Sequence, residues 1–309
     1  MLAAYVNRLG SAEEICHGPL PDPVAGPGEV LVRMAATTVN HVDAFVRSGA
    51  YRTPLPLPFV VGRDLVGTVV TVGAGVSGFA VDDSVWTNSL GHDGRQGAAA
   101  ELAVVPADRL YPLSSGVDPV TAAAVLHPAA TAYLGLVTHG GLTAGETVVV
   151  VGAHGNVGQA AVTIASHLGA QVCAVTRERG APENPDCVDL WLDAAGVNDV
   201  PAALAVLRRR GRMVLLAGLD TTATFPVGQL YTKDLTIHGF AISIATVTEL
   251  ADAATMINTL LASGGLQPGG VVTMPLSRTA EAHRMIESGQ LHRQRVVLVP
   301  DHLAGDHDT

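Results

Sequence analysis

The sequence predicts an α/β protein of two domains, one of them inserted into the other. The first third carries short apolar runs separated by Pro/Gly turns, as the strands of a β-rich domain do: Glu29–Val39, Leu65–Val72 and Ser84–Trp86. From about Asp118 helix and strand patterns alternate, which implies a parallel sheet covered on both faces. A length of 309 residues also fits two domains better than one core.

The alternating segments define the inserted domain and the return to the first one. Predicted helices are Pro119–Thr138, Val157–Leu168, Val200–Arg210, Glu249–Ala262 and Thr279–Ser288, and predicted strands are Thr147–Val151, Gln171–Thr176, Val188–Asp193, Met213–Ala217 and Arg295–Val299. A Gly/Pro-rich segment, Ser263–Gly270, connects the inserted domain to the C-terminal part of the β-rich domain. We therefore assign residues 1–118 and 264–309 to the β-rich domain and 119–263 to the inserted domain. Only Gly305–Thr309 is expected to be frayed.

The composition indicates a globular protein of a reducing compartment, with 48% hydrophobic and 15% charged residues. The formal net charge of −10 argues against nucleic acid or an anionic membrane as a partner. The one basic run, Arg208–Arg210, is expected to end a helix and to complement its dipole. Cys16, Cys173 and Cys187 form no CxxC pair, so we expect neither disulfides nor a thiolate metal site. With no signal peptide and no apolar run long enough to span a membrane, we expect a cytoplasmic protein.

A glycine turn between a buried strand and a helix is the most informative local motif. Thr147–Val151 is almost all valine, as expected for a central parallel strand, and the turn leads into the helix Val157–Leu168. Glycines let the backbone approach a pyrophosphate, and the free amides of the helix N-terminus attract its charge. We expect dinucleotide binding by Gly152, His154, Gly155, Asn156, Val157 and Gly158. The alternative is a tight turn between strand and helix that binds nothing.

The end of the next strand indicates which dinucleotide binds. NAD sites carry a carboxylate there for the ribose 2′-hydroxyl, whereas this strand ends at Thr176 and continues with Arg177. Together with Arg179, these residues favour the 2′-phosphate of NADPH. Both arginines could also be ordinary solvated charges of the loop.

The chain is too short after this strand for a complete doubly wound sheet. Only ten residues, Arg177–Asp186, precede the next strand, and they include Pro182 and Pro185. A single helical crossover needs at least about 10–12 residues, so the outer strand and its flanking helices are predicted to be absent. Because the loss reduces the wall around the adenosine, we expect NADPH to bind weakly or with an exposed adenine.

Stretches from end to end of the chain resemble the medium-chain dehydrogenase/reductase superfamily. They are Pro21–Val32, Val39–Tyr51, Pro58–Gly67, Ala130–Tyr133, the glycine turn, Asp193–Gly196, Lys233–Phe240 and Ala282–Gly289. The sequence is similar to the zinc-independent quinone oxidoreductase, or zeta-crystallin-like, branch. The resemblance implies a GroES-like catalytic domain, a shortened Rossmann domain, and a homodimer paired through an edge strand at Ile237–Ile244.

The resemblance also bears on metal binding. Zinc alcohol dehydrogenases of this superfamily carry a Cys and a His-Glu pair at two turns, which here read Asn40–Asp43 and Gly62–Asp64. No thiolate remains, and His41 with Asp64 does not make a three-ligand site, so no metal is expected. Addition of hydride to an electron-poor quinone or enone needs no metal, unlike alcohol oxidation.

The resemblance assigns four residues to the catalytic site: Asn40, Asp43, Tyr51 and Thr131. The tyrosine is the candidate to hydrogen-bond or protonate the acceptor oxygen, and the threonine is expected near the nicotinamide ribose. Alternatively, Tyr51 packs as a loop aromatic on Leu55 or Leu57, and the Asn–Asp pair braces the turn after the strand. Phe45 stands where the branch often has a tyrosine, so one polar contact is expected to be lost.

Further cofactor contacts are implied after two later strands. They are Ala217, Gly218 and Leu219, with Phe240, Ala241 and Ile242 flanking the nicotinamide. Asn156 replaces a usual glycine, and because asparagine tolerates left-handed backbone angles, the turn should still form. The remaining histidines show no ligand spacing and are expected to be structural: His127, His139, His167, His238 and His283.

The predicted function is NADPH-dependent transfer of hydride to a small apolar quinone or α,β-unsaturated carbonyl. One rival is a pathway-specific enoyl or ene reductase of natural-product biosynthesis. A rival of another class is a binding or scaffold protein that keeps the fold without redox chemistry. The shortened adenosine wall and Phe45 favour that rival, whereas the intact glycine turn and Arg177 oppose it.

Overall fold

The computed structural model describes residues 1–304, so the expected fraying of Gly305–Thr309 lies outside the described residues. Its contacts divide the chain into two compact units. Unit 1 comprises Met1–His127 and the residues from Asn258 on, and unit 2 comprises Pro128–Ile257. The divisions fall within two helices, α2 (Pro119–Tyr133) and α6 (Val247–Ala262).

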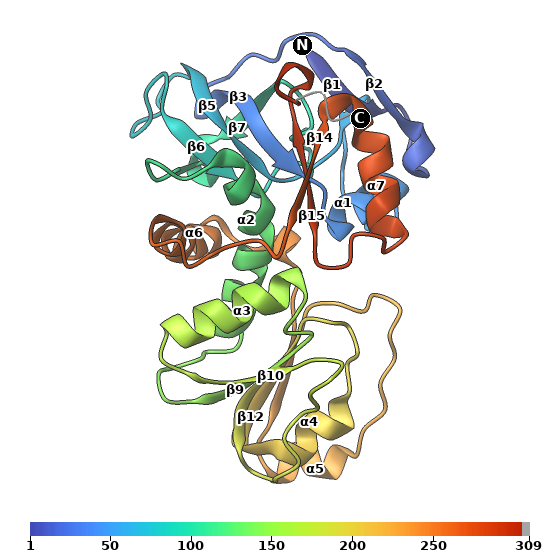
Figure 1. Cartoon of the computed structure of the whole chain (residues 1–309), viewed down its shortest axis with the longest axis vertical. Helices are drawn as coiled ribbons and strands as arrows, with labels where there is room; N and C mark the ends of the chain where they lie inside the picture. Colours follow the sequence, from blue (N-terminus) through green and yellow to red (C-terminus); the bar gives the residue numbers. More distant parts are fainter. Residues whose placement is uncertain (305–309) are drawn as a thin grey trace. The chain divides into compact units, whose positions relative to one another are not determined.

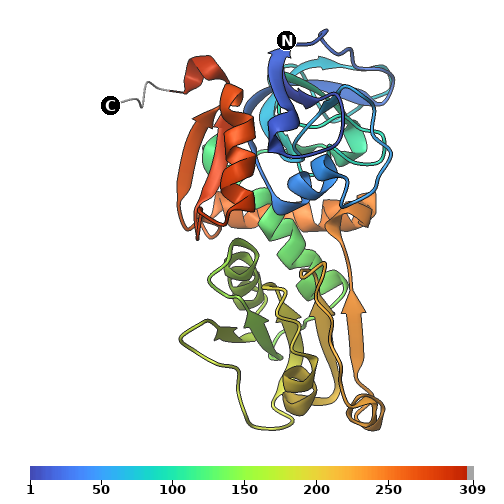
Figure 2. The same cartoon turned by 90° about the vertical axis from the view of Figure 1, so that its right-hand side faces the viewer.

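Unit 1 is β-rich, as the sequence predicts (Figure 1). A three-stranded sheet has the order β2 (Ile15–Pro19), β1 (Leu2–Val6), β4 (Phe59–Val60). A seven-stranded sheet has the order β14 (Val271–Pro275), β15 (Arg295–Val299), β3 (Glu29–Thr38), β5 (Leu65–Val72), β6 (Ser84–Thr87), β8 (Tyr111–Pro112), with β7 (Leu102–Pro106) also paired to β3. Helices α1 (His41–Ser48) and α7 (Thr279–Glu287) lie side by side in both views (Figures 1 and 2).

The C-terminal strand of unit 1 pairs with an N-terminal one. β15 runs antiparallel to β3, with Val297 opposite Thr38 and Leu298 opposite Thr37. Every residue of β15 is buried, and the Thr38 hydroxyl donates to the carbonyl of Val296 at 2.6 Å. This pairing brings Arg295, the first residue of β15, next to the turn that follows β3.

Unit 2 contains the predicted parallel sheet and confirms the α/β fold class. Its order is β10 (Gln171–Val175), β9 (Thr147–Val151), β11 (Val188–Asp193), β12 (Leu207–Leu215), β13 (Thr236–Gly239). The helices are α3 (Asn156–His167), α4 (Val200–Val206) and α5 (Val227–Thr232), with parts of α2 and α6. Between β10 and β11, residues 176–187 form neither helix nor strand, which confirms the missing crossover.

The predicted helix Val200–Arg210 was wrong in its second half. Helix α4 ends at Val206, and β12 begins at the next residue. In this run, Leu207 pairs with Val188 of β11 and the Arg210 N–H donates to the Lys233 carbonyl at 2.8 Å. Two-sided pairing with β11 and β13 begins just beyond it, at Arg212. The basic run therefore meets carboxylates rather than a helix end: Arg208 Nε lies 3.0 Å from Asp189.

One helical stretch is long and apolar enough to cross a membrane, which our sequence reading overlooked. Pro119–Thr138 contains no Asp, Glu, Lys or Arg; α2 continues in it as a π-helix, Leu134–Thr138. However, 72% of its most apolar 18 residues are buried inside the protein, as in a core helix.

The predicted edge strand is shorter than expected. β13 is indeed the sheet edge, but it ends at Gly239, and Ile242–Ile244 forms a turn of 3-10 helix instead. If two copies of the protein pair through this edge, β13 offers four residues for the pairing.

Candidate functional site

Asn40 and Asp43 lie together at the start of α1, in unit 1. The Asn40 backbone N–H donates to Asp43 Oδ2 at 2.7 Å, and the Asp43 N–H donates to the Asn40 carbonyl at 3.0 Å. The pair therefore braces the turn after β3, one of the two roles considered for it. Both side chains are buried.

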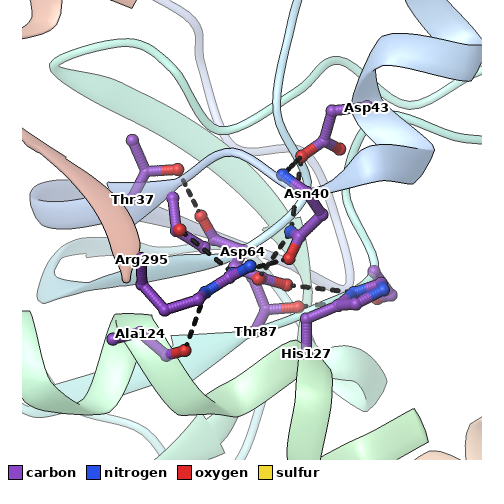
Figure 3. Close-up of polar contacts among 10 residues, drawn as sticks. Thr37, Asn40, Asp43, Asp64, Thr87, Ala124, His127 and Arg295 are labelled. Carbon is purple, nitrogen blue, oxygen red and sulfur yellow. Dashed lines mark hydrogen bonds and ion pairs between the residues drawn. The ribbon is translucent and has the colours of Figure 1, made fainter. Parts of the chain in front are cut away.

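The Asn40 side chain is also the centre of a buried polar network (Figure 3). Its amide Nδ2 donates to Asp64 Oδ2 at 2.9 Å and to Asp43 Oδ2 at 3.3 Å, and its Oδ1 accepts from Arg295 Nη2 at 2.7 Å. Because every polar atom of the amide has a charged partner, its orientation is fixed.

Arg295 and Asp64 hold this network in the core. The arginine donates from Nε to the Ala124 carbonyl (3.0 Å) and from Nη2 to Thr38 Oγ1 (3.1 Å). Asp64 Oδ1 lies 3.6 Å from His127 Nδ1 on α2. Figure 3 shows the contacts running from Asp43 through Asn40 and Asp64 to His127, with a branch through Arg295 to Ala124.

The sequence analysis missed this network. From the sequence, Asp64 was considered only as an incomplete metal ligand, His127 only as a structural residue, and Arg295 only as the first residue of a predicted strand. A signal was present: the Arg63–Asp64 pair interrupts an apolar stretch, and a buried charge requires a partner.

The network changes the acidity of Asp43. Burial, followed by the nearby Asp64 carboxylate, raises the pKa of Asp43 to about 6, against the opposing influence of Arg63. Near neutral pH this carboxyl group can therefore hold or release a proton, a property that general acid–base groups share.

Tyr51, the third candidate residue of unit 1, follows α1. Its side chain is half-buried and packs against the core cluster of unit 1, as that of Leu55 also does, and its ring centroid lies 5.8 Å from that of His92. Leu57, one of the two packing partners considered for Tyr51, is exposed. Burial, followed by Arg63, lowers the pKa of His92 to about 4, so its ring is neutral at pH 7.

The glycine turn of unit 2 has the predicted geometry. β9 is buried, Gly152 has a φ of +75°, and α3 begins after Gly155 without any side-chain cap. A Cβ added to Gly158 would lie 2.1 Å from the Gly152 carbonyl oxygen, so only glycine lets helix and strand approach this closely. The first backbone amides of α3, including those of Asn156 and Val157, have no partner within the helix.

The other candidate cofactor residues follow the carboxyl ends of neighbouring strands. Asp193 ends β11, and its carboxylate accepts from the backbone amides of Ala195, Gly196 and Asn198 at 2.6–2.9 Å. This folds the loop against Gly218, where a Cβ would lie 2.6 Å from Asn198 Nδ2. Ala217 and Leu219, on either side, are exposed.

An aromatic group follows β13. Phe240 is half-buried, with its ring centroid 4.5 Å from that of His139, which in turn stacks on His238 at 4.5 Å. Ala241 is half-buried and Ile242 is buried. Thr131 is buried on α2 and belongs to unit 2, whereas the other three candidate catalytic residues belong to unit 1.

The end of β10 forms a compact turn beside the glycine turn. Thr176 Oγ1 donates to Glu178 Oε2 (2.8 Å) and accepts from the Arg179 amide (3.2 Å), while Arg177 and Arg179 are exposed. Glu178 Oε2 lies 4.0 Å from His154 Nδ1, which links the two turns. Within residues 1–304, no group of three or more His, Cys, Asp or Glu side chains is arranged to hold a metal ion.

A β-rich unit with a buried polar turn and a parallel sheet with a glycine turn together define the architecture of a dehydrogenase. Residues 26–115 match the family "Alcohol dehydrogenase GroES-like domain", and residues 168–297 match "Zinc-binding dehydrogenase". The chain belongs to the medium-chain dehydrogenase/reductase superfamily of oxidoreductases, and its similarities lie in the zeta-crystallin-like quinone oxidoreductase branch, as the sequence predicts.

Known proteins similar to this chain cover nearly all of it. Human quinone oxidoreductase is 28% identical over 327 residues, covering 97% of this chain and 98% of its own. Acryloyl-coenzyme A reductase of Sulfurisphaera tokodaii is 27% identical, covering 87% and 91%. A mycobacterial quinone oxidoreductase structure has a TM-score of 0.84 at 26% identity, covering 97% and 100%. A mycobacterial structure complexed with NADPH has a TM-score of 0.80 at 27% identity, with the same coverage.

Proposed function

We propose that this protein is an NADPH-dependent oxidoreductase that transfers hydride to a quinone or an α,β-unsaturated carbonyl without a metal. The observation that carries the proposal is the glycine turn, where Gly158 lets the uncapped N-terminus of α3 approach the end of β9. The similarity to quinone oxidoreductases over 97% of the chain supports the same reaction class. Bound NADPH would supply the hydride.

In this proposal the residues of unit 2 bind and orient the cofactor. Backbone amides at Gly155, Asn156 and Val157 would receive the pyrophosphate, because they stand at the positive end of α3. The exposed Arg177 and Arg179 would pair with the 2′-phosphate. Residues after the later strands would surround the nicotinamide half: Ala217, Gly218, Leu219, Phe240, Ala241 and Ile242, with Thr131 near the ribose.

The residues of unit 1 serve the acceptor. Tyr51 would donate a hydrogen bond to the acceptor oxygen, and Asn40 with Asp43 would form the polar end of the acceptor site. The raised pKa of Asp43 allows it to hold a proton at about pH 6. We also propose a homodimer paired through the four-residue edge strand β13.

Titration with NADPH and NADH, followed by nicotinamide fluorescence, tests the cofactor assignment. We expect micromolar binding of NADPH and a clear preference over NADH. Replacing both Arg177 and Arg179 by alanine should remove that preference, because the 2′-phosphate loses its counter-charges. The exposed Arg33, changed to alanine in unit 1, is the matched control. No binding of either nucleotide at millimolar concentration would favour the non-redox descendant and end the proposal.

The glycine turn gives a second test. Gly158→Ala places a methyl group 2.1 Å from the Gly152 oxygen, so α3 must move away from β9. We expect NADPH affinity to fall by about tenfold or more, equivalent to at least about 1.4 kcal/mol. Gly228→Ala is the control, since a Cβ there meets nothing within 4 Å. Equal affinities for the two variants would contradict the proposed binding mode.

Enoyl reduction remains the second candidate because of the acryloyl-coenzyme A reductase similarity. Turnover of enoyl thioesters but not of quinones, at saturating NADPH, would favour that candidate.

A further inference from the structure

A buried cation stands unpaired beside the polar network of unit 1. Arg63 is only 2% exposed, and its Nη2 atom is buried without a hydrogen-bond partner among the described residues. A buried guanidinium normally pairs with carboxylates or carbonyls, because an unsatisfied charged donor costs several kcal/mol. An unpartnered group of this kind needs an explanation, and a missing acceptor is the simplest one.

The surroundings of Arg63 balance its charge without satisfying its hydrogen bonds. Burial lowers the pKa of the Arg63 guanidinium, whereas Asp43, Asp64 and Tyr51 raise it through space. Asp43 and Asp64 direct oxygen atoms to Asn40 instead. The two carboxylates thus offset the charge of Arg63 while its Nη2 donor remains unused, and this favours a ligand whose oxygen becomes negative only during the reaction.

Two partly exposed rings lie within electrostatic range of this guanidinium. Tyr51 and His92 pack together, and the Nδ1 atom of His92 is also buried without a hydrogen-bond partner. The segment carrying His92 is tied to Arg63, since the Leu90 N–H donates to the Arg63 carbonyl at 3.2 Å. Arg95 and Arg109 add further positive charge around His92 and Arg63. Both rings are partly exposed, so an incoming oxygen would approach Arg63 from their side and not through the core.

We propose that Arg63 is the oxyanion-binding residue of the acceptor site, and that the acceptor is a neutral conjugated carbonyl compound. This inference rests on the proposed function. Hydride adds to the conjugated carbon, a C–H bond forms, the C=C π bond breaks, and the displaced electron pair moves to the carbonyl oxygen. NADPH is oxidised to NADP⁺, and the acceptor becomes an enolate; for a quinone, loss of a proton from the carbon that received the hydride and protonation of the second oxygen then convert this enolate to the quinol. The guanidinium donates to that oxygen until a proton from solvent completes the reduction.

The test uses 4-nitrophenol, an inert mimic of the anionic product that needs no cofactor. Its absorbance reports ionisation when it is titrated with excess protein between pH 5 and 9. The pKa of the bound phenol should fall by about one unit or more, a roughly tenfold preference for the phenolate. Arg63→Met should abolish that shift, and Arg63→Lys should keep part of it. Arg52→Met, an exposed arginine beside Tyr51, should behave like the wild type.

Kinetics with a benzoquinone or enone add a second readout. Arg63→Met should reduce kcat/KM by about 10²-fold or more while NADPH binding, which belongs to unit 2, stays unchanged. An unshifted or raised phenol pKa in the wild type, no phenol binding at millimolar concentration, or wild-type behaviour of Arg63→Met overturns the inference. If Arg63→Met does not fold, the inference is decided by the pKa of the phenol bound to the wild type and to Arg63→Lys. Failure of the proposed function would give a different result. The protein would then not oxidise NADPH, although Arg63 would still lower the pKa of the bound phenol.

Discussion

Replacing Arg295 by methionine is expected to lower the free energy of unfolding by about 3–5 kcal/mol. The side chain is buried and donates to Asn40 Oδ1, Thr38 Oγ1 and the Ala124 carbonyl. Methionine fills similar space but leaves these acceptors unsatisfied. It also removes one of the cations that face the Asp43 and Asp64 carboxylates. The loss therefore combines desolvation with uncompensated charge, and not merely a missing contact.

Urea unfolding at pH 7, followed by circular dichroism, measures this change. Arg284→Met is the matched control, because Arg284 is half-exposed and pairs with Glu13 on the surface at 3.6 Å. That variant should lose less than about 1 kcal/mol. Equal losses for the two variants would mean that the buried network contributes no more than a surface ion pair.

Asp43→Asn is expected to change how stability depends on pH. The folded pKa of Asp43, about 6, lies above the usual value near 4, so the native state binds its proton more tightly than the unfolded chain. The stability from this group is complete below the unfolded pKa and is lost as pH rises through 6. Asparagine cannot ionise, yet its oxygen can still accept from the Asn40 N–H.

The difference in unfolding free energy between variant and wild type should therefore shift by about 2–3 kcal/mol in favour of the variant from pH 4 to pH 7. Denaturant melts at four pH values give this difference directly. Asp252→Asn, an exposed position on α6, should show a nearly constant difference because its side chain stays in water. Parallel curves for Asp43→Asn and the wild type would show that the network accommodates the ionised carboxylate without penalty.

The local sequence patterns predicted the fold well wherever they agreed with the tertiary contacts. The valine run Thr147–Val151 is a central strand, and the glycine turn starts α3 within one residue of the prediction. The ten-residue connection after β10 is too short for a crossover, and none is present. The helical pattern gave a wrong prediction at Arg208–Arg210. These residues lead directly into Arg212–Leu215, whose pairing with two neighbouring strands outweighed local preference.

The sequence could not predict how the polar site is completed. Asn40 and Asp43 are three residues apart, so a local pattern suggests their contact. Arg295 is 255 residues from Asn40, and nothing local to either reveals that β15 pairs with β3. Arg63 lies within the Gly62–Asp64 turn, which was considered only for zinc binding, because the burial of its side chain follows from the fold.

The pairing of β15 with β3 also has a consequence for biosynthesis. Ribosomes deliver the chain from its N-terminus, and domains generally fold as they emerge. The turn at Asn40 is made early, but its amide has no arginine to hold it until residue 295 has been translated. A nascent chain or a truncated product that stops in α7 can form the sheet of unit 2, yet it lacks the polar centre of unit 1. Ribosome-bound intermediates should thus complete the proposed cofactor site before the proposed acceptor site.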